Sequence, residues 1–431
     1  MIKRAAVKSA IIILLFAVLF VVPGRAEYRA GPGRTAFNPD DASRGDKLTK
    51  IWETIIGDLG TNISSPVIYL GHIYIGTRGG ILYKINKYDG SFASYHQLTG
   101  HINGAVAASD AGIYFGCNDG FMYAMDHDLT LKPGWPKKAR APVAGAPVFA
   151  ALASVYYVVF SDTAGNVYFI NPMDGSVTTV SSGDYTAAAP ALAGNNIITT
   201  SPSGRVYKTN ESEATAAYLM PGGSYVPAVA KNTEDVFVAD VTGRVHLLNI
   251  MSGTAPAVSD LAGKLTNPLI YNTGRNVITA AVGSGSLFWL NGDSLAAEKT
   301  STGSMGAEIS GGAAGAINTF IIKKNGSIEA YDNEAGHTGT METGAAVFGS
   351  MALDNCMVIY GSDGKLSLYA VSDSIDNPPG YSYLPDFPNP VEISGSAGSF
   401  SSAFKWYDIY YENPDSGRVY ITSNQAVNSA A

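Results

Sequence analysis

Short runs of alternating apolar and polar residues, punctuated by glycine, extend through most of the chain. The segment from Ser65 to Asn86, SPVIYLGHIYIGTRGGILYKIN, contains three such runs with Gly-rich breaks between them. A two-residue spacing of apolar positions is typical of β-strands, and breaks of this kind are typical of tight turns. No segment sustains the 3.6-residue spacing of an amphipathic helix. The pattern predicts an antiparallel β-meander within an all-β chain.

The meander recurs about every 40 residues, which is the mark of a repeat architecture. Each copy has a glycine that opens its third run, and positive φ at that glycine suits the tight turn into the run. Six residues later most copies have Asn or Asp, whose side chain hydrogen-bonds the backbone beyond it and starts the next turn. The anchor glycines are Gly80, Gly120, Gly165, Gly204, Gly243, Gly285, Gly326, Gly364 and Gly417. The Asn and Asp residues are Asn86, Asp126, Asn171, Asn210, Asn249, Asn291 and Asp332.

The runs of each copy differ in composition in a consistent order. The first run is short and rich in small residues, as in PALAG from position 190, and the second is β-branched or aromatic. A fourth, less regular run follows, for example LKPGWPKK from 131 or SVTTVSS from 176. Small residues fit strands that crowd around an axis, and four strands per copy of this length are typical of propeller blades. We therefore expect a single β-propeller of four-stranded antiparallel blades.

The number of blades depends on the C-terminal copy, which follows a longer interval. We count nine copies and expect Lys50 to Ile56 (KIWETII), a strand without strands of its own before it, to pair with Gly417 to Thr422. Such pairing would close the ring and cover the open edge of the last copy. The alternatives are eight blades with the last copy as an appendage, and a small separate C-terminal domain.

The N-terminus predicts export. Residues 1–26 have basic residues, an apolar run from Ala10 to Val22 and a small residue at position 26, as in a signal peptide. An uncleaved membrane anchor is the alternative, although the run is short for a full span. We expect a polar linker at 27–47, the propeller at 48–424 and a tail at 425–431. Cleavage would leave a chain that does not span a membrane, in the periplasm or outside a bacterial cell.

The net charge bears on whether the chain binds nucleic acid, and the positions of the two cysteines bear on whether it forms a disulfide. The formal net charge is −8, and removal of the signal peptide would make it −12, because the peptide has four basic and no acidic residues. An acidic chain without a basic stripe is a poor ligand for nucleic acid. Cys117 and Cys356 belong to the second and eighth copies, too far apart around a ring for a disulfide. We expect both thiols to be reduced and buried.

The copies resemble the pyrroloquinoline-quinone-type propeller repeat, with SPVIYLGHIYIGTRGGILYKINKYDG as the clearest match. The resemblance covers roughly residues 50 to 423 and implies a fold more than a function. Two branches of this group imply different functions. One contains quinoprotein dehydrogenases, and the other contains non-enzymatic envelope scaffolds similar to the propeller subunit of the outer-membrane barrel-assembly machinery.

The residues that the dehydrogenase resemblance requires are missing from the sequence. There is no adjacent cysteine pair, no D-x-D-x-D-G calcium loop, and no tryptophan that recurs at one position of the blades. The histidines lack zinc spacing, and His246 stands where other copies have Tyr, which favours packing over ligation. The Asp-Gly pairs are interpreted as turn residues: Asp89, Asp119, Asp174 and Asp363. We therefore assign no catalytic, cofactor-binding or metal-binding residue.

The sequence favours an exported, non-catalytic, monomeric scaffold that binds a protein or an extended peptide. Loops on the faces of the ring and open edges of outer strands are the surfaces available for it. The alternatives are a quinone-dependent oxidoreductase and, because the chain has 25 Tyr, a surface protein that binds glycans.

Overall fold

The computed structural model describes residues 25–26, 31, 34–39, 41, 43, 45, 47–56, 64–152, 155–186, 188–265, 267–283, 285–301, 308–332, 334–347, 352–354, 356–372, 408–413 and 417–422. Every regular element in these residues is a β-strand. Within the same residues no helix is both long and apolar enough to cross a membrane. Most of the predicted signal peptide lies outside the described part of the chain.

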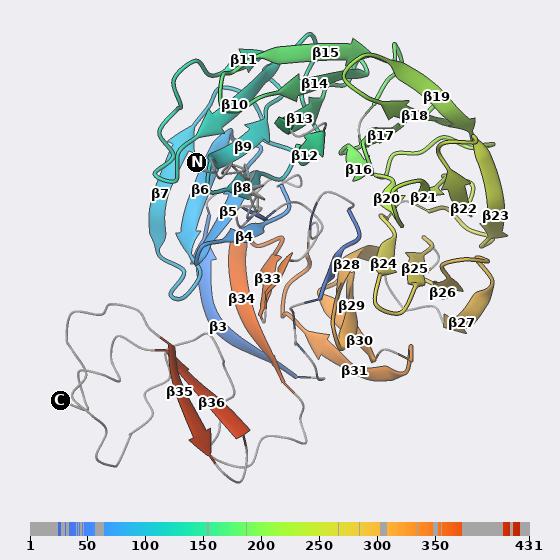
Figure 1. Ribbon diagram of the computed structural model, residues 1–431. Coiled ribbons are helices and arrows are strands. Elements are labelled where there is room, and N and C mark those ends of the chain that lie inside the picture. Colours follow the sequence, from blue (N-terminus) through green and yellow to red (C-terminus); the bar gives the residue numbers. More distant parts are fainter. Residues whose placement is uncertain are drawn as a thin grey trace, which may run out of the picture.

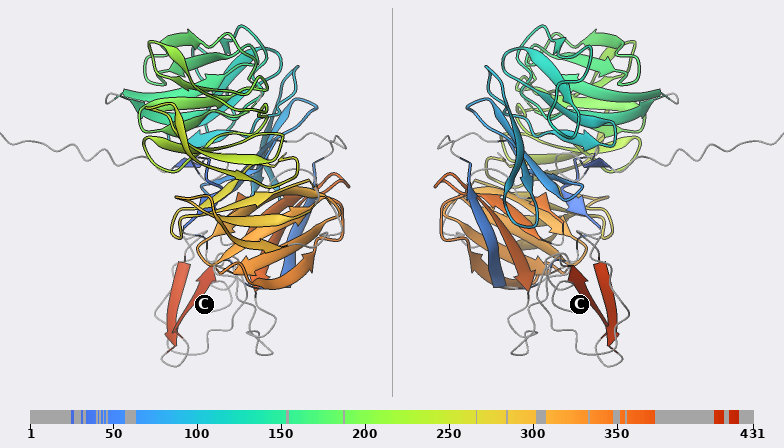
Figure 2. Two further views of the ribbon diagram at one scale, coloured as in Figure 1. Left: turned by 90° about the vertical axis from the view of Figure 1, so that its right-hand side faces the viewer. Right: turned by 90° about the vertical axis from the view of Figure 1, so that its left-hand side faces the viewer.

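The described strands form eight blades around a ring (Figure 1). Side views show the blades standing next to one another around its circumference (Figure 2). Blade 1 has β4 (Val67–Tyr69), β5 (His72–Gly76), β6 (Ile81–Asn86) and β7 (Phe92–Gln97). Blade 2 has β8 (Ala107–Ser109), β9 (Gly112–Gly116), β10 (Phe121–Met125) and β11 (Lys137–Lys138). Blade 3 has β12 (Val148–Leu152), β13 (Val155–Ser161), β14 (Asn166–Ile170) and β15 (Val177–Ser181).

The next three blades follow in chain order. Blade 4 has β16 (Ala191–Ala193), β17 (Asn196–Thr200), β18 (Arg205–Thr209) and β19 (Ala214–Leu219). Blade 5 has β20 (Val229–Ala230), β21 (Asp235–Ala239), β22 (Arg244–Asn249) and β23 (Thr254–Asp260). Blade 6 has β24 (Ile270–Asn272), β25 (Val277–Ala281), β26 (Leu287–Asn291) and β27 (Ala297–Ser301).

Blade 8 takes its outer strand from the N-terminal part of the chain. Blade 7 has β28 (Ile309–Gly315), β29 (Asn318–Lys323), β30 (Ser327–Asp332) and β31 (His337–Glu342). Blade 8 has β32 (Ala352–Leu353), β33 (Met357–Tyr360), β34 (Lys365–Ser372) and, outermost, β3 (Lys47–Ile55). Among the four repeat strands of each blade, the first lies closest to the axis and the fourth lies outermost, as the composition of the runs predicts, with β3 in the fourth position of blade 8.

The turn chemistry predicted from the repeat is confirmed in each blade. The anchor glycines of blades 1 to 8 have φ between 78° and 104°. Each donates its N–H to the carbonyl oxygen three residues before it, as Gly80 does to Thr77 at 3.1 Å. All seven Asn and Asp side chains accept a hydrogen bond from the backbone N–H two residues on, as Asn86 Oδ1 does from Tyr88 at 2.9 Å.

The hydrophobic core lies in the seams between neighbouring blades. The buried apolar residues form eight clusters, and each cluster joins two adjacent blades. Ile73 and Ile75 of blade 1, for example, pack with Val358 and Leu368 of blade 8. Burial of each such side chain stabilises the fold by about 1.5–3 kcal/mol. Because the seam between blades 8 and 1 is filled like the others, the ring is closed.

The predicted closure through a ninth copy is wrong, and the eight-blade alternative is confirmed. β3 pairs antiparallel with β34, with Lys50 opposite Tyr369 and Ile55 opposite Lys365, and does not pair with Gly417 to Thr422. Figure 1 shows β3 running alongside β34 at the rim. The register explains why β3 pairs with β34, because β3 supplies the fourth strand that blade 8 lacks, in the position that β7 holds in blade 1.

The C-terminal copy stays outside the eight blades. β35 (Asp408–Asn413) and β36 (Gly417–Thr422) pair with each other, with Tyr410 opposite Tyr420, and form their own two-stranded sheet. They are the two runs that resemble the second and third strands of a blade. The longer interval that precedes this copy, around Asp376, lies outside the described residues.

The prediction for the two cysteines is confirmed. Neither forms a disulfide, and both are buried. Cys117 belongs to the seam between blades 1 and 2, and Cys356 to the seam between blades 8 and 1. Burial raises the pKa of the Cys117 thiol to about 12, so the thiolate that reacts with other groups is scarce at neutral pH.

Candidate functional site: the filled axis and the exposed rim

The N-terminal segment runs across the centre of the ring, where a propeller could hold a ligand. Arg34 bonds residues just before the inner strands of blades 3 and 4, and Tyr271 of blade 6 donates its N–H to Thr35 O at 2.8 Å. Ala314 of blade 7 donates to Ala36 O, also at 2.8 Å. Consecutive residues that touch blades 3, 4, 6 and 7 must lie near the axis, and Figure 1 shows this segment inside the ring.

Arg34 fixes the segment to the ring. Its side chain is fully buried. The guanidinium donates from Nε to Pro190 O at 2.9 Å and from Nη2 to Pro147 O at 2.7 Å and Ala146 O at 3.1 Å. The planar fork of an arginine suits several fixed acceptors at once. These bonds also satisfy carbonyl groups that lie at the ends of inner strands, where burial without a partner is costly.

The segment continues as an extra inner strand of blade 7. β2 (Phe37–Asn38) runs parallel to β28, and Asp41 O accepts the N–H of Ala316 at 2.8 Å. The buried Asp41 carboxylate accepts the N–H and the hydroxyl of Ser43 at 3.0 and 3.2 Å. Gly315 makes room for it, because a Cβ there would lie 2.6 Å from Asp41 Oδ1.

The other end of the segment meets blade 2. β1 (Arg25–Ala26) pairs antiparallel with β8, so that blades 2 and 7 each gain a fifth, innermost strand. The described residues of the region interpreted as a polar linker therefore include buried residues that contact inner strands. Cleavage after Ala26 would remove β1 and leave the contacts of Arg34 and β2 in place.

Polar side chains on either side of the anchor turns form internal pairs. The hydroxyl of Tyr168 donates to Asp162 Oδ2 at 2.7 Å, and His246 Nε2 lies 3.3 Å from Asp240 Oδ2 in the same positions of blade 5. His246 is buried beside Tyr218. It therefore packs in place of a tyrosine, as predicted.

Blade 7 carries the most charged of these pairs. Lys323 Nζ and His337 Nε2 each lie 2.5 Å from the carboxylate of Glu329, and Thr340 donates to it at 2.8 Å. Burial raises the pKa of Glu329, but the bonds from Lys323, Thr340 and His337 outweigh it and lower the pKa. A carboxylate held ionised by three fixed partners is suited to holding strands together rather than to accepting a proton.

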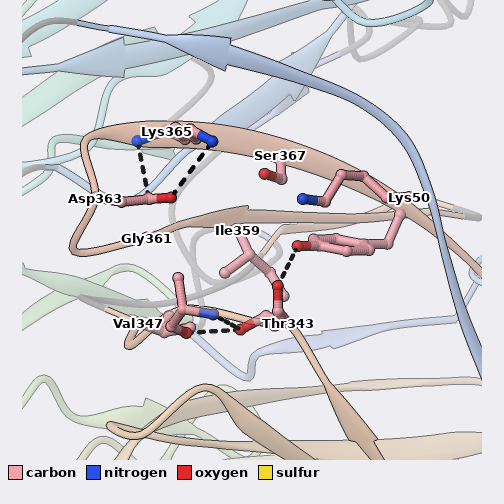
Figure 3. Close-up of a pocket in the computed structure, with 10 residues that line it drawn as sticks. Lys50, Thr343, Val347, Ile359, Gly361, Asp363, Lys365 and Ser367 are labelled. Atoms are coloured by element: carbon pink, nitrogen blue, oxygen red, sulfur yellow. Dashed lines mark hydrogen bonds and ion pairs between the residues drawn. The ribbon is translucent and has the colours of Figure 1, made fainter.

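A small cavity lies between blades 7 and 8 (Figure 3). Its walls include Lys50 of β3, Thr343, and Ser367 of β34, and the Tyr369 hydroxyl donates to Thr343 O at 3.2 Å. The volume of about 20 Å³ is the room of one water molecule. A quinone or a sugar does not fit this cavity.

The Asp-Gly aspartates are turn residues, as predicted. The side chains of Asp89, Asp119, Asp174 and Asp363 each accept the backbone N–H two residues on, at 2.8 to 3.2 Å. Within the described residues no three His, Cys, Asp or Glu side chains gather as metal ligands would.

Both faces of the ring expose apolar side chains. We call the face with the turns between first and second and between third and fourth strands the Leu70 face, and the opposite one the Gly80 face. Five exposed apolar residues lie on the Leu70 face, in blades 1, 3, 5 and 7. They are Leu70 (66%), Val155 (36%), Met173 (88%), Met251 (58%) and Ile317 (36%). This exposure could not be predicted from the sequence, because single apolar residues in turns do not stand out from those in the strands.

The closed ring of four-stranded blades defines the chain as an eight-bladed β-propeller. A family model described as outer membrane protein assembly factor BamB matches residues 41–256, and the chain belongs to this family of pyrroloquinoline-quinone-like repeat proteins. A search of curated protein sequences returns no relative.

Solved structures share the fold at low sequence identity. BamB from Moraxella catarrhalis is 12% identical, with a TM-score of 0.60 over 75% of this chain and 99% of that one. The quinohemoprotein alcohol dehydrogenase from Comamonas testosteroni is 12% identical, with a TM-score of 0.63 over 84% and 83%. The computationally designed Ika8 protein is 14% identical, with a TM-score of 0.59 over 74% and 98%. Likeness at this level concerns the fold alone.

Proposed function

We propose that the protein is a non-catalytic scaffold of the bacterial cell envelope that binds a protein or an extended peptide on the surface of the ring. One observation carries the proposal: the chain's own N-terminal segment, fixed by Arg34, occupies the axis where a propeller would hold a small molecule. Membership of a family described as an outer membrane protein assembly factor supports the envelope location and a protein partner. Export through the predicted signal peptide is part of the same proposal.

The Leu70 face is the part of the ring that we propose for the partner. Its exposed apolar side chains, Met173 and Leu70 above all, lie among acidic turn residues such as Asp128 and Asp174. Apolar contacts within a polar rim are the usual composition of a protein interface.

Site-specific photo-crosslinking in the expressing cell tests this proposal. A photoreactive residue at Leu70 or Met251 is expected to give a discrete crosslinked partner, whereas the same residue at Tyr225 on the Gly80 face is the matched control. Tyr225 is also more than half exposed. Equal crosslinking from both faces, or none from either, would count against the proposed surface.

The enzyme alternative is tested on the purified protein. The quinohemoprotein alcohol dehydrogenase has the same fold, so a quinone-dependent oxidoreductase is the competing function. The proposal predicts no tight binding of pyrroloquinoline quinone with Ca²⁺ and no alcohol-dependent dye reduction after that mixture is added. Dye reduction that depends on quinone would refute a non-catalytic scaffold.

A separate observation favours the glycan alternative. Tyr95 and Phe92 on β7 are 66% and 49% exposed, and their ring centroids lie 6.4 and 5.3 Å from that of Tyr83. Exposed aromatic rings are able to stack on sugars. Binding of envelope polysaccharide that Tyr95→Ala abolishes would support this alternative, and unchanged binding would remove it.

A further inference from the structure

The outer strands of the propeller differ in how they protect their free edges. A β-bulge interrupts the pairing between third and fourth strands in blades 1, 4, 5, 6, 7 and 8. Bulges twist an edge away and discourage pairing with another chain. Blade 2 has an outer strand of only two residues, Lys137 and Lys138. Short strands and lysines are further protections of the same kind.

Blade 3 lacks these protections. β15 (Val177–Ser181) pairs with β14 in regular register from Ser181 opposite Asn166 to Val177 opposite Ile170, without a bulge. The sequence VTTVS has no charge and no proline. In the described part of the chain, no side chain of β15 forms a hydrogen bond to a neighbouring blade. A straight, neutral, β-branched edge of this kind pairs readily with another strand.

The hydrogen bonds of β15 show which backbone groups are available. Asn171 donates to Ser176 O at 3.0 Å, and Ser182 donates to Gly165 O at 2.9 Å. Since bonding alternates along an antiparallel pair, the groups of Thr178 and Val180 also point toward β14. The N–H and C=O groups of Val177, Thr179 and Ser181 therefore point away from the blade. Such a row matches an extended polypeptide strand and no smaller ligand.

We propose that the strand which pairs with this edge is β15 of a second copy of the chain, antiparallel about a two-fold axis at Thr179. In that register Thr179 lies opposite its own copy and Val177 lies opposite Ser181 of the partner subunit. Every outward-pointing residue then meets another, and the three pairs exchange six main-chain hydrogen bonds. The result is a continuous eight-stranded sheet through two blades.

The exposed side chains of β15 itself support a second copy as the occupant. Val177 is 42% exposed, and Thr178 and Ser181 are also exposed. The antiparallel register places Val177 opposite Ser181 of the partner subunit, so that both side chains are covered and no charge is buried. A two-fold interface requires such self-complementarity. This inference goes beyond the proposed function and replaces the monomer expected from the sequence.

The test is the mass of the purified chain in solution as a function of concentration, measured by sedimentation equilibrium. The wild type is expected to shift from one chain toward two. Thr179→Pro removes an outward N–H without touching the bonds to β14, so it is expected to weaken association at least tenfold while the thermal unfolding curve stays unchanged. A wild type that remains a single chain at its highest soluble concentration would overturn the proposal.

Charge substitutions at the axis test the register. Thr179→Lys and Thr179→Glu each place like charges opposite one another and are expected to give single chains, whereas an equimolar mixture of the two is expected to recover the double mass. Thr215→Lys and Thr215→Glu, on the exposed face of the bulged β19, are the matched controls and should leave the mass as in the wild type. Dimers that persist in both single Thr179 variants, or a mixture that fails to recover, would show that another surface or register is used.

Discussion

The backbone N–H of Ile56 donates to the carbonyl oxygen of Gly364 at 3.0 Å, although the two residues are more than three hundred positions apart. The same bond occurs within single blades, from Leu98 to Gly80 and from Met220 to Gly204, at 2.8 Å in both cases. Ile56 thus ends the fourth strand of blade 8 as Leu98 ends that of blade 1. The first strand of the ring completes the last blade in the register of a native repeat.

Trp52 is expected to stabilise the seam that this closure creates. Its indole N–H donates to Lys87 O at 2.8 Å, and Lys87 Nζ pairs with Asp354 across the same seam at 2.8 Å. Trp52→Ala should lower the free energy of unfolding in urea by about 2–3 kcal/mol, since a partly buried aromatic and a hydrogen bond are lost. Tyr95→Ala, at an exposed position of β7, should change it by less than about 0.5 kcal/mol. Equal losses of stability in the two variants would contradict the packing of Trp52 in this seam.

Arg34 is expected to contribute more than any surface arginine. Arg34→Ala leaves buried carbonyl groups of blades 3 and 4 without their donor and should cost about 3 kcal/mol or more. Arg34→Lys retains the charge but not the fork and should cost less. The exposed Arg78→Ala is the control. Urea unfolding distinguishes them, and an Arg34→Ala variant as stable as Arg78→Ala would mean that the axis is not filled as described.

The anchor turns predict a difference between two glycines with similar φ. Gly204 has φ +89°, and a Cβ there would lie 2.6 Å from Met220 O, whereas Gly183 has φ +70° and open space around it. Gly183→Ala should lower the free energy of unfolding only by the energy needed to hold an alanine in the left-handed conformation, about 1–2 kcal/mol. Gly204→Ala adds a clash with backbone and should cost roughly twice that or more. Thermal unfolding of both variants gives the comparison, and the reverse order would contradict the turn geometry.

His246 is expected to make stability depend on pH. Burial lowers the pKa of His246, against the opposing hydrogen bond with Asp240. Below about pH 6.5 the unfolded chain therefore binds more protons than the folded protein, and the free energy of unfolding falls as the pH drops from 7 toward 5. His246→Tyr, which copies the arrangement at Tyr168, should show a shallower fall. Identical slopes in urea titrations at several pH values would refute this account.

The two thiols are expected to be unreactive in the folded protein. Cys117 and Cys356 are buried, and the raised pKa of Cys117 keeps it protonated. A maleimide reagent should label neither within the time in which it labels both in urea. Rapid labelling in the native state, or a mobility change on reducing gels, would contradict the burial of these residues.

The repeat could be predicted from sequence because its turn chemistry is local. Gly80 and Asn86 form their turns through hydrogen bonds to residues two or three positions away, so the residues that make each turn are visible in the local sequence. The outer position of SVTTVSS from 176 and the packing of His246 followed from the same registration.

The closure and the filled axis could not be predicted in this way. β36 resembles a third strand as well as β34 does, and nothing in either run says which one β3 joins. The deciding feature is the bond from Ile56 to Gly364, which is non-local. Arg34 bonds carbonyl groups more than a hundred positions away, and backbone acceptors leave no mark in a sequence. The bulges that distinguish β15 from other outer strands are likewise invisible in composition.

A designed disulfide tests the eight-bladed closure most directly. Glu53 of β3 lies opposite Ser367 of β34. By alternation from the bonded pair of Ile56 and Gly364 it is a pair without direct backbone bonds, in which the Cα atoms are about 4.5 Å apart and within disulfide range. In a background without Cys117 and Cys356, Glu53→Cys with Ser367→Cys is expected to crosslink within one chain under mild oxidation, seen as a joined peptide pair after proteolysis. Glu53→Cys with Tyr420→Cys, the equivalent pairing in a nine-bladed ring, is expected to stay reduced. A crosslink from position 53 to 420 and none to 367 would contradict the structure of the ring.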